Sequence, residues 1–379
     1  MSGVTTARGT RPANRRALIL EAATALFAER GYEHVSVRDI ADAVEVGPSA
    51  LYRHFPGKEQ ILADVLSSVL DGFRGRIEAA ADRETCLAAL ASFSLDQRDA
   101  GVLWQREARH LPDGAAPRVH AALRDVREAF GRAVSTTGES GAATIAALAV
   151  LLSPAFTRPD LPRAQHEALL VQLAERALHT PIAVSAPERP PAQGRPRVGP
   201  RARLVSSAMR LFAAGSYAGV SVEELAADVG LSAGSLYSHL PTKQDLLVIA
   251  LARADGHLQL GMDHILAETA DPQAALRRLA ASYAKFAIAH PDLVDALVTE
   301  VHNLPTDKAR AMRGEQRAYV DEWSHLLAEV HPELSPAAAT VTVQAALSAC
   351  NDLARTPSVV RRVDAEELTA RICLAVLDA

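Results

Sequence analysis

Residues 26–62 read LFAERGYEHVSVRDIADAVEVGPSALYRHFPGKEQIL, and residues 211–247 read LFAAGSYAGVSVEELAADVGLSAGSLYSHLPTKQDLL. The two stretches align without a gap at a constant offset of 185 residues. Identical pairs occur throughout and include Leu26/Leu211, Phe27/Phe212, Tyr32/Tyr217, Ser36/Ser221, Leu51/Leu236, Tyr52/Tyr237, His54/His239 and Lys58/Lys243. Because the offset is about half of the 379 residues, the sequence predicts two copies of one unit rather than a short repeat array.

Local signals divide each copy into short helices. In the first copy, the apolar stripe of an opening helix is formed by Ile19, Ala22, Ala23 and Leu26. We expect this helix to end near Gly31. Ser36 and Ser221 each stand three residues before a carboxylate, which predicts an N-cap and a capping box at the start of a second helix. A long fourth helix is expected to begin at Lys58 and at Lys243.

A tight turn and a third helix separate these elements. In the second copy, Gly230 can adopt the left-handed conformation that ends the second helix, and Ser232 can cap the third. In the first copy, Glu45 and Gly47 occupy these two positions, which predicts a weaker turn and a weaker cap. Pro48 is acceptable there because it falls in the first turn of the third helix.

A supporting helix followed by a short helix, a tight turn and a second short helix presents one helix to the major groove of DNA. Both stretches, with Leu-Tyr-x-His runs at 51–54 and 236–239 and a lysine four residues later, resemble the tetracycline-repressor (TetR) family. The resemblance implies an all-α protein of two tandem TetR-like units. Each unit is then a three-helix DNA-binding domain followed by an all-helical ligand and dimerisation domain. The expected domains are 14–74 and 201–259 for DNA binding (motifs at about 37–56 and 222–241), 75–180 and 260–379 for the helical domains, and 181–200 for the linker.

Composition independently favours a globular helical chain. Hydrophobic residues make up 49% and charged residues 22%, near the globular average, and only 4% of residues are aromatic. Neither the three cysteines nor the 13 histidines show the spacing of a disulfide framework or a metal site. We therefore expect no metal, no cofactor and a cytoplasmic location. The longest apolar stretch, residues 142–152, is too short to span a bilayer, so no membrane partner is expected.

The formal net charge of −5 conceals two basic windows. Residues 1–20 contain four arginines and residues 189–210 contain six, and neither window has an acidic residue. The second window overlaps a linker, residues 181–200, with six prolines. Basic segments beside helix-turn-helix motifs favour contact with the phosphates of double-stranded DNA.

DNA contacts are expected on and around the third helices. By resemblance, the tyrosines and lysines contact the DNA backbone, and exposed side chains of the third helices read bases. Only Arg53 can form the bidentate contact with guanine, since no Arg or Lys lies between Leu231 and Leu240. The candidate residues are Ser36, Ser49, Tyr52, Arg53, His54 and Lys58 in the first copy and Ser221, Ser235, Tyr237, Ser238, His239 and Lys243 in the second. The alternative is that the tyrosines and histidines only pack the third helix and the lysines are solvated.

About 120 residues of helical pattern follow each motif. The resemblance implies that they enclose a pocket for a small-molecule effector and that their last two helices build a four-helix dimer interface. The segments suited to that interface are 141–156, 163–179, 336–353 and 365–377. The pocket candidates are Phe93, Trp104, His110, Phe130, Tyr283, Phe286, His302 and Trp323. Ordinary core packing explains each of them equally well.

These features predict a ligand-responsive transcriptional regulator that is not an enzyme, in the form of a repressor. Its two fused units are expected to form an intramolecular pseudo-dimer. The alternative is a homodimer of two chains. One alternative is a helical ligand-binding or scaffold protein whose degenerate helix-turn-helix units no longer bind DNA. A second is a hydrolase, because residues 230–234 read GLSAG and match the G-x-S-x-G nucleophile elbow. That elbow follows a buried strand, whereas the pattern before Ser232 is helical.

Overall fold

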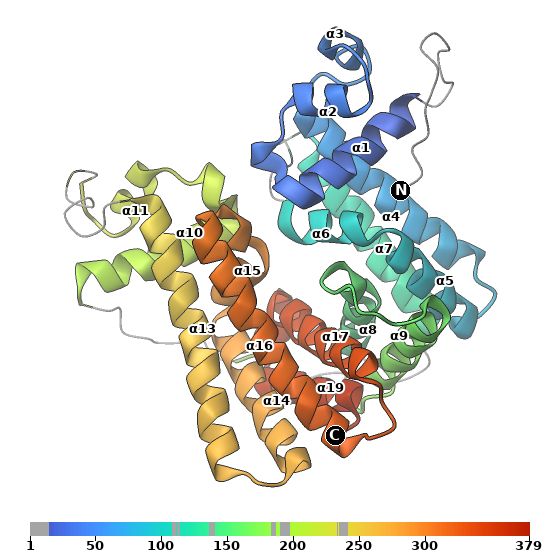
Figure 1. Ribbon diagram of the computed structural model, residues 1–379, viewed down its shortest axis with the longest axis vertical. Coiled ribbons are helices and arrows are strands. Elements are labelled where there is room, and N and C mark those ends of the chain that lie inside the picture. Colours follow the sequence, from blue (N-terminus) through green and yellow to red (C-terminus); the bar gives the residue numbers. More distant parts are fainter. Residues whose placement is uncertain are drawn as a thin grey trace.

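The computed structural model describes residues 15–107, 111, 114–135, 141–182, 187–189, 198–232, 234 and 242–379, without the side chains of residues 33, 104–107, 215, 216 and 218. Within these ranges the chain is helical almost throughout and forms no strand (Figure 1). The pairing of extended backbone between Glu188 and Arg362 is an isolated bridge. The predicted all-α fold is confirmed.

Each unit begins with a head, the name used below for the helix-turn-helix domain, and continues into a helical domain. The first unit contains α1 (Arg15–Arg30), η1 (Tyr32–His34), α2 (Val37–Ala43), α3 (Pro48–Leu51), α4 (Lys58–Ala79), α5 (Arg83–Asp96), α6 (Arg98–Glu107), α7 (Ala116–Val134), α8 (Gly141–Leu152), η3 (Ser153–Ala155) and α9 (Arg163–Leu178). The second contains α10 (Pro200–Gly219), α11 (Val222–Asp228), α13 (Lys243–Glu268), α14 (Pro272–Ala289), α15 (Pro291–Thr299), η4 (Val301–Asn303), α16 (Thr306–Val330), α17 (Pro336–Ala354), α18 (Pro357–Val360) and α19 (Ala365–Leu377).

The helix boundaries are set by local chemistry. The α1 helix buries Ile19, Ala23 and Phe27 and ends just before Gly31, whose φ of +82° suits glycine. The long fourth helices begin at Lys58 and Lys243, as predicted. Both run without a break across the boundaries expected between head and helical domain, so each head is joined rigidly to its own helical domain.

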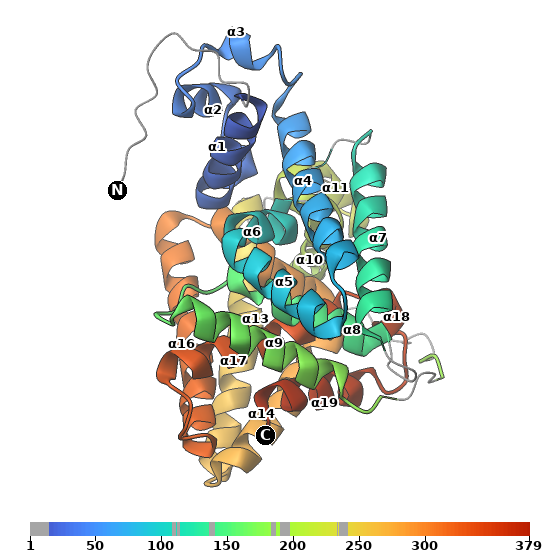
Figure 2. The same cartoon turned by 90° about the vertical axis from the view of Figure 1, so that its right-hand side faces the viewer.

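The two units meet at a four-helix junction, defined as α8 and α9 of the first unit packed against α17 and α19 of the second. Figure 2 shows α9 lying beside α17 and α19. The facing helices α8 and α17 are rich in buried alanine, which lets their backbones approach closely. At the edge of the junction, Arg176 Nη2 lies 2.8 Å from Asp378 Oδ2, and Arg371 Nη1 donates to Pro181 O at 3.0 Å.

A second contact joins the units nearer the heads. The α15 helix packs on α6 and also on α10. Close by, Gly31 of the first unit lies against His302 in η4 of the second: a Cβ built on Gly31 would be 3.0 Å from His302 Cδ2. One continuous hydrophobic core runs through the first unit and the second helical domain, whereas the second head has a separate core cluster around Phe212 and Leu246. The first unit and the second helical domain are thus packed as a single body.

The linker residues that the structure describes lie against the second unit. Val363 N donates to Pro187 O at 2.9 Å, and Arg189 Nη2 lies 2.9 Å from Glu366 Oε1. None of the described helices combines the length and apolarity needed to cross a bilayer.

Candidate functional site

Both heads open their second helix with the predicted capping box. Ser36 Oγ accepts from Asp39 N at 3.1 Å, and Ser36 N donates to Asp39 Oδ2 at 2.8 Å. Ser221 and Glu224 form the same pair of bonds at 3.1 and 2.7 Å. Hydrogen bonding to the serine lowers the pKa of each carboxyl. Ser36 and Ser221 therefore act as N-caps here, and DNA contact by either remains a prediction.

The turn after this helix has the same geometry in both heads. Glu45 N donates to Asp42 O at 3.1 Å and Val46 N to Ala41 O at 2.9 Å, the two bonds of a Schellman motif. Gly230 N and Leu231 N repeat the pattern at 3.0 and 2.8 Å. The left-handed residue is Gly230 in one turn, with φ +71°, and Glu45 in the other, with φ +53°. The first head thus keeps the turn at the cost of backbone strain.

The third helix of the first head presents a polar, aromatic surface. Its α3 begins at the N-cap Gly47 with Pro48 in the first turn, as predicted. Leu51 and Phe55 are fully buried and fix the helix on the head, while four candidate DNA-contact residues face solvent: Ser49, Tyr52, Arg53 and His54. Tyr52 is 55% exposed, although it directly follows the fully buried Leu51. Arg53 forms no ion pair within the described part of the chain. The phenol and the guanidinium are available to a ligand.

The two candidate lysines make internal contacts that sequence reasoning did not foresee. Lys58 Nζ donates to Tyr32 O at 3.1 Å and lies 4.2 Å from the centre of the Tyr32 ring. Lys243 Nζ donates to Val220 O at 2.6 Å and lies 4.4 Å from the Tyr217 ring. Burial lowers the pKa of Lys243. Each lysine pins the connection between the first two helices, so neither is simply solvated.

The second head carries a polar clasp, defined as Ser207 and Arg210 of α10 bonded to Asp228 at the end of α11. Ser207 Oγ donates to Asp228 Oδ2 at 2.6 Å, and Arg210 pairs with the same oxygen. The first head has alanine at all three equivalent positions. Arg203 Nη1 donates to Val229 O at 3.2 Å. Two arginines of the basic window 189–210, Arg203 and Arg210, therefore form bonds within the second head.

Four candidate DNA-contact residues of the second head lie outside the described residues: Ser235, Tyr237, Ser238 and His239. The GLSAG run is described as far as Ser232 and at Gly234, and it follows helix α11 rather than a strand. A nucleophile elbow requires that strand, so the hydrolase alternative lacks its structural context.

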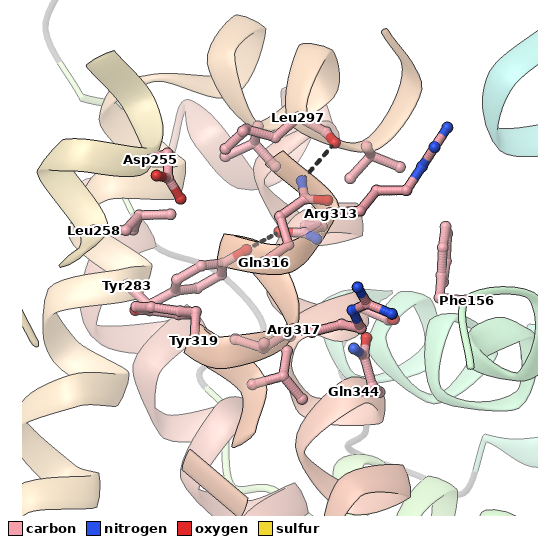
Figure 3. Close-up of a pocket in the computed structure, with 16 residues that line it drawn as sticks. Phe156, Asp255, Leu258, Tyr283, Leu297, Arg313, Gln316, Arg317, Tyr319 and Gln344 are labelled. Atoms are coloured by element: carbon pink, nitrogen blue, oxygen red, sulfur yellow. Dashed lines mark hydrogen bonds between the residues drawn. The ribbon is translucent and has the colours of Figure 1, made fainter. Parts of the chain in front are cut away.

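The second helical domain contains a pocket of about 370 Å³. Its wall is formed by α13, α14, α15, α16 and α17, and Phe156 of the first unit closes one side (Figure 3). Tyr283 lines it, and Tyr283 Oη donates to Asn351 Oδ1 at 2.7 Å. Asp255 also lines it, and burial together with the nearby Glu315 raises the pKa of this carboxyl. This volume lies within the range of roughly 300–1,000 Å³ typical of small-molecule sites.

The other pocket candidates that the structure describes do not line this space. The structure buries Phe93, Phe130, Phe286 and Trp323 in the hydrophobic core. His302 lies in η4 beside Gly31 of the first unit. His110 and the side chain of Trp104 fall outside the described residues. The pocket residues that sequence reasoning missed include Phe156, Asp255, Arg313, Gln316, Arg317 and Gln344.

The apolar pocket inside the first helical domain is much smaller, and the larger hollows of the first unit, of about 500 and 450 Å³, lie between the head and the helical domain and include acidic residues such as Asp64 and Asp99 in their lining. A pocket lined entirely by apolar residues and Gly101, among them Leu66, Phe73 and Leu148, has a volume of about 40 Å³. That is far below the size of a typical small-molecule site. Among the described residues, no cluster of histidine, cysteine and carboxylate side chains could hold a metal ion.

Two capped helix-turn-helix heads on a wholly helical scaffold place this chain among the helix-turn-helix proteins. Residues 19–65 and 204–249 match the family described as bacterial regulatory proteins, tetR family, and residues 269–355 match a tetracycline-repressor-like C-terminal domain. Both heads and the second helical domain thus resemble the TetR family. The resemblance noted in the sequence is confirmed.

Similar proteins include the HTH-type transcriptional repressor KstR2 of Mycolicibacterium smegmatis, 39% identical over 112 residues that make up 27% of this chain and 55% of the relative. KstR2 of Rhodococcus jostii is 36% identical over 26% of this chain and 52% of its own length. The chain therefore spans about half the length of these curated relatives. A TetR-family regulator from Bordetella parapertussis aligns in structure over 48% of this chain and 96% of its own, with 18% identity and a TM-score of 0.45.

Proposed function

We propose that this protein is a sequence-specific transcriptional repressor that carries both DNA-reading heads in one chain and releases DNA when a small molecule binds. The observation that carries the proposal is the first head. There, a buried Leu51 and Phe55 hold α3 so that Tyr52 and Arg53 face solvent together. An exposed tyrosine suits a phosphate, and a guanidinium with no ion pair to the residues that the structure describes suits guanine.

One chain is proposed to replace the usual pair of subunits. The four-helix junction supports this, because α8 and α9 already cover α17 and α19. A tethered partner is present at high effective concentration, so assembly should not depend on protein level. The two third helices differ in sequence, PSALYRHF against AGSLYSHL, so we expect an asymmetric operator with unlike half-sites about one helical turn apart.

The α15 helix is the proposed route from effector to DNA. Val294, Leu297 and Val298 of α15 line the pocket, and Leu297 O accepts from Gln316 Nε2 at 3.0 Å. The same helix packs on α10 of the second head and on α6 of the first unit. A ligand that displaces α15 would change the spacing of the two heads, and heads that read successive grooves lose contacts when their spacing changes.

The test begins with selection of bound DNA from a random pool, followed by a salt titration of the selected site. Affinity should fall steeply, with a log-log slope near −0.9 per neutralised phosphate. A flat response would favour the scaffold alternative. Because Lys58 also supports Tyr32, Tyr52→Ala is the cleaner variant for phosphate contact and should weaken binding to all sequences.

Base reading is tested with Arg53→Lys, which keeps the charge but removes the planar fork. It should relax preference at one base pair, at a cost of about 1–3 kcal/mol. Arg132→Ala, an exposed arginine on α7, is the matched control and should bind like the wild type. Tyr237→Ala tests the second head in the same way. Footprinting and mass measurement should find one chain on an asymmetric site, and a dimer of chains on a perfect palindrome would contradict the pseudo-dimer.

A further inference from the structure

The pocket in the second helical domain is chemically uneven along its length. Its wall is largely apolar and includes Leu258, Val294, Leu297, Val298, Val320 and Leu347. Asp255 lies at one end, and Arg313, Arg317 and Phe156 lie at the other (Figure 3). An apolar ligand body would therefore be flanked by a carboxyl at one end and by cations at the other.

The two arginines form the cationic end. Arg313 and Arg317 stand four residues apart on α16, so they lie on one face of that helix. Neither forms an ion pair with any residue that the structure describes. In Figure 3, Arg317 lies beside Gln344, and both it and Arg313 extend toward the side closed by Phe156. An arginine stays charged at any working pH and offers a fork of donors that fits a carboxylate or a phosphate.

At the opposite end the lining includes one carboxyl, that of Asp255. Burial and the nearby Glu315 raise the pKa of this carboxyl, and Gln259 on the same helix α13 acts in the opposite direction and lowers it. The side of the pocket nearest the first unit, which Arg313 and Arg317 line, therefore favours a negatively charged group of a ligand.

We propose that this pocket binds an amphipathic anion: a compact apolar body enclosed by the second helical domain, with a carboxylate or phosphate held by Arg317 and Arg313. The proposal rests on the function proposed above and specifies its effector. The volume of about 370 Å³ suits a medium-length chain or a small ring system. The apolar pocket inside the first helical domain, at about 40 Å³, is too small for such a ligand, and the larger hollows of the first unit contain Asp64, Asp71, Asp96 and Asp99, which disfavour an anion, so we expect one ligand per chain.

The position of Phe156 gives the ligand a second role. This side chain follows η3 of the first unit, is 38% exposed, and still lines the pocket of the second. An occupant therefore touches both units, adjacent to the packing of η3 on α17. Binding adds a contact across the two units at a point separate from the contact between α15 and α6.

The test uses calorimetric titration of the full chain with straight-chain carboxylates from hexanoate to dodecanoate. We expect saturable binding of one molecule per chain, with decanoate at least tenfold tighter than the uncharged decanamide. Arg317→Gln should weaken decanoate about tenfold and leave decanamide unchanged. Arg310→Gln, on the same helix but outside the pocket, should bind like the wild type. Phe156→Ala should weaken both probes several-fold.

The proposal is overturned if no carboxylate of the series binds, if decanoate and decanamide bind equally, if Arg317→Gln has no effect, or if two molecules bind per chain. DNA binding without ligand is measured in parallel by fluorescence anisotropy. Intact DNA binding with no carboxylate binding refutes the ligand class alone. Carboxylate binding with no DNA binding refutes the proposed function and leaves the pocket assignment standing.

Discussion

Replacing Glu45 by glycine should strengthen the turn between α2 and α3. Glu45 has a φ of +53°, in the region where a side chain costs about 1–2 kcal/mol. Glycine removes that strain but gives the unfolded chain more freedom, which costs about 0.4–1 kcal/mol. Glu45 is exposed and its side chain forms no hydrogen bond or ion pair with the described residues, so little else changes. The expected net gain is about 0.7 kcal/mol.

The second turn supplies the reciprocal variant. Gly230 has a φ of +71°, and a Cβ placed on it would meet no atom within 4 Å. Gly230→Ala therefore introduces backbone strain without a clash, and we expect a loss of about the same size. Gly47→Ala is the control, because Gly47 also has open space around its Cβ but an unstrained φ of −73°.

Hydrogen exchange of the full chain, followed by mass spectrometry, reports the local opening of α2 and its turn. A gain of about 0.7 kcal/mol slows exchange of the α2 amides about threefold in Glu45→Gly, since about 1.4 kcal/mol is a factor of ten. Exchange in α11 should quicken by a similar factor in Gly230→Ala. Unchanged or faster exchange of α2 in Glu45→Gly would refute the assignment of strain to this residue.

Three ionisable groups within the fold lead to further expected outcomes. Burial and Arg98 lower the pKa of His166 to about 4 from 6.5, so the folded state binds fewer protons than the unfolded state between these pH values. The free energy of unfolding should therefore fall by up to about 3 kcal/mol as the pH drops from 6.5 to 4. Denaturation of His166→Leu should lack this pH dependence. Burial raises the pKa of Cys86 to about 11, so iodoacetamide at pH 8 should modify it at least about tenfold more slowly in folded than in denatured protein. Arg355 is partly exposed and lies between Asp295 and Asp352, at 3.3 and 2.6 Å. Arg355→Leu should cost about 1–3 kcal/mol in chemical denaturation because two half-buried carboxylates lose their shared cation.

The sequence was most informative where structure is set by neighbouring residues. Capping boxes, the left-handed turn and the start of α4 each depend on a few adjacent side chains, so Ser36, Gly230 and Lys58 marked them correctly. The repeat adds information, because Glu45 aligns with Gly230. A glycine at that position indicates a left-handed backbone, and Glu45 adopts the same conformation.

Sequence reasoning failed where the outcome depends on packing between distant helices. Aromatic residues were chosen as pocket candidates, but Phe130 and Trp323 bury large apolar surfaces and fill the core instead. The pocket is lined by residues such as Arg317 and Phe156, which are distant in sequence and come from different units. The internal bonds of the two lysines were missed for the same reason, because Lys58 and Tyr32 are 26 residues apart.

The four-helix junction has a consequence for how this protein can change. In a homodimer every substitution at the interface occurs twice, and each surface must fit a copy of itself. Here α8 and α9 meet helices of different sequence, so a larger side chain on one can be matched by a smaller one on the other. Each half can then change independently of the other: the pockets inside the two helical domains differ in volume, at about 40 and 370 Å³, and residues 48–55 and 233–240 differ in sequence.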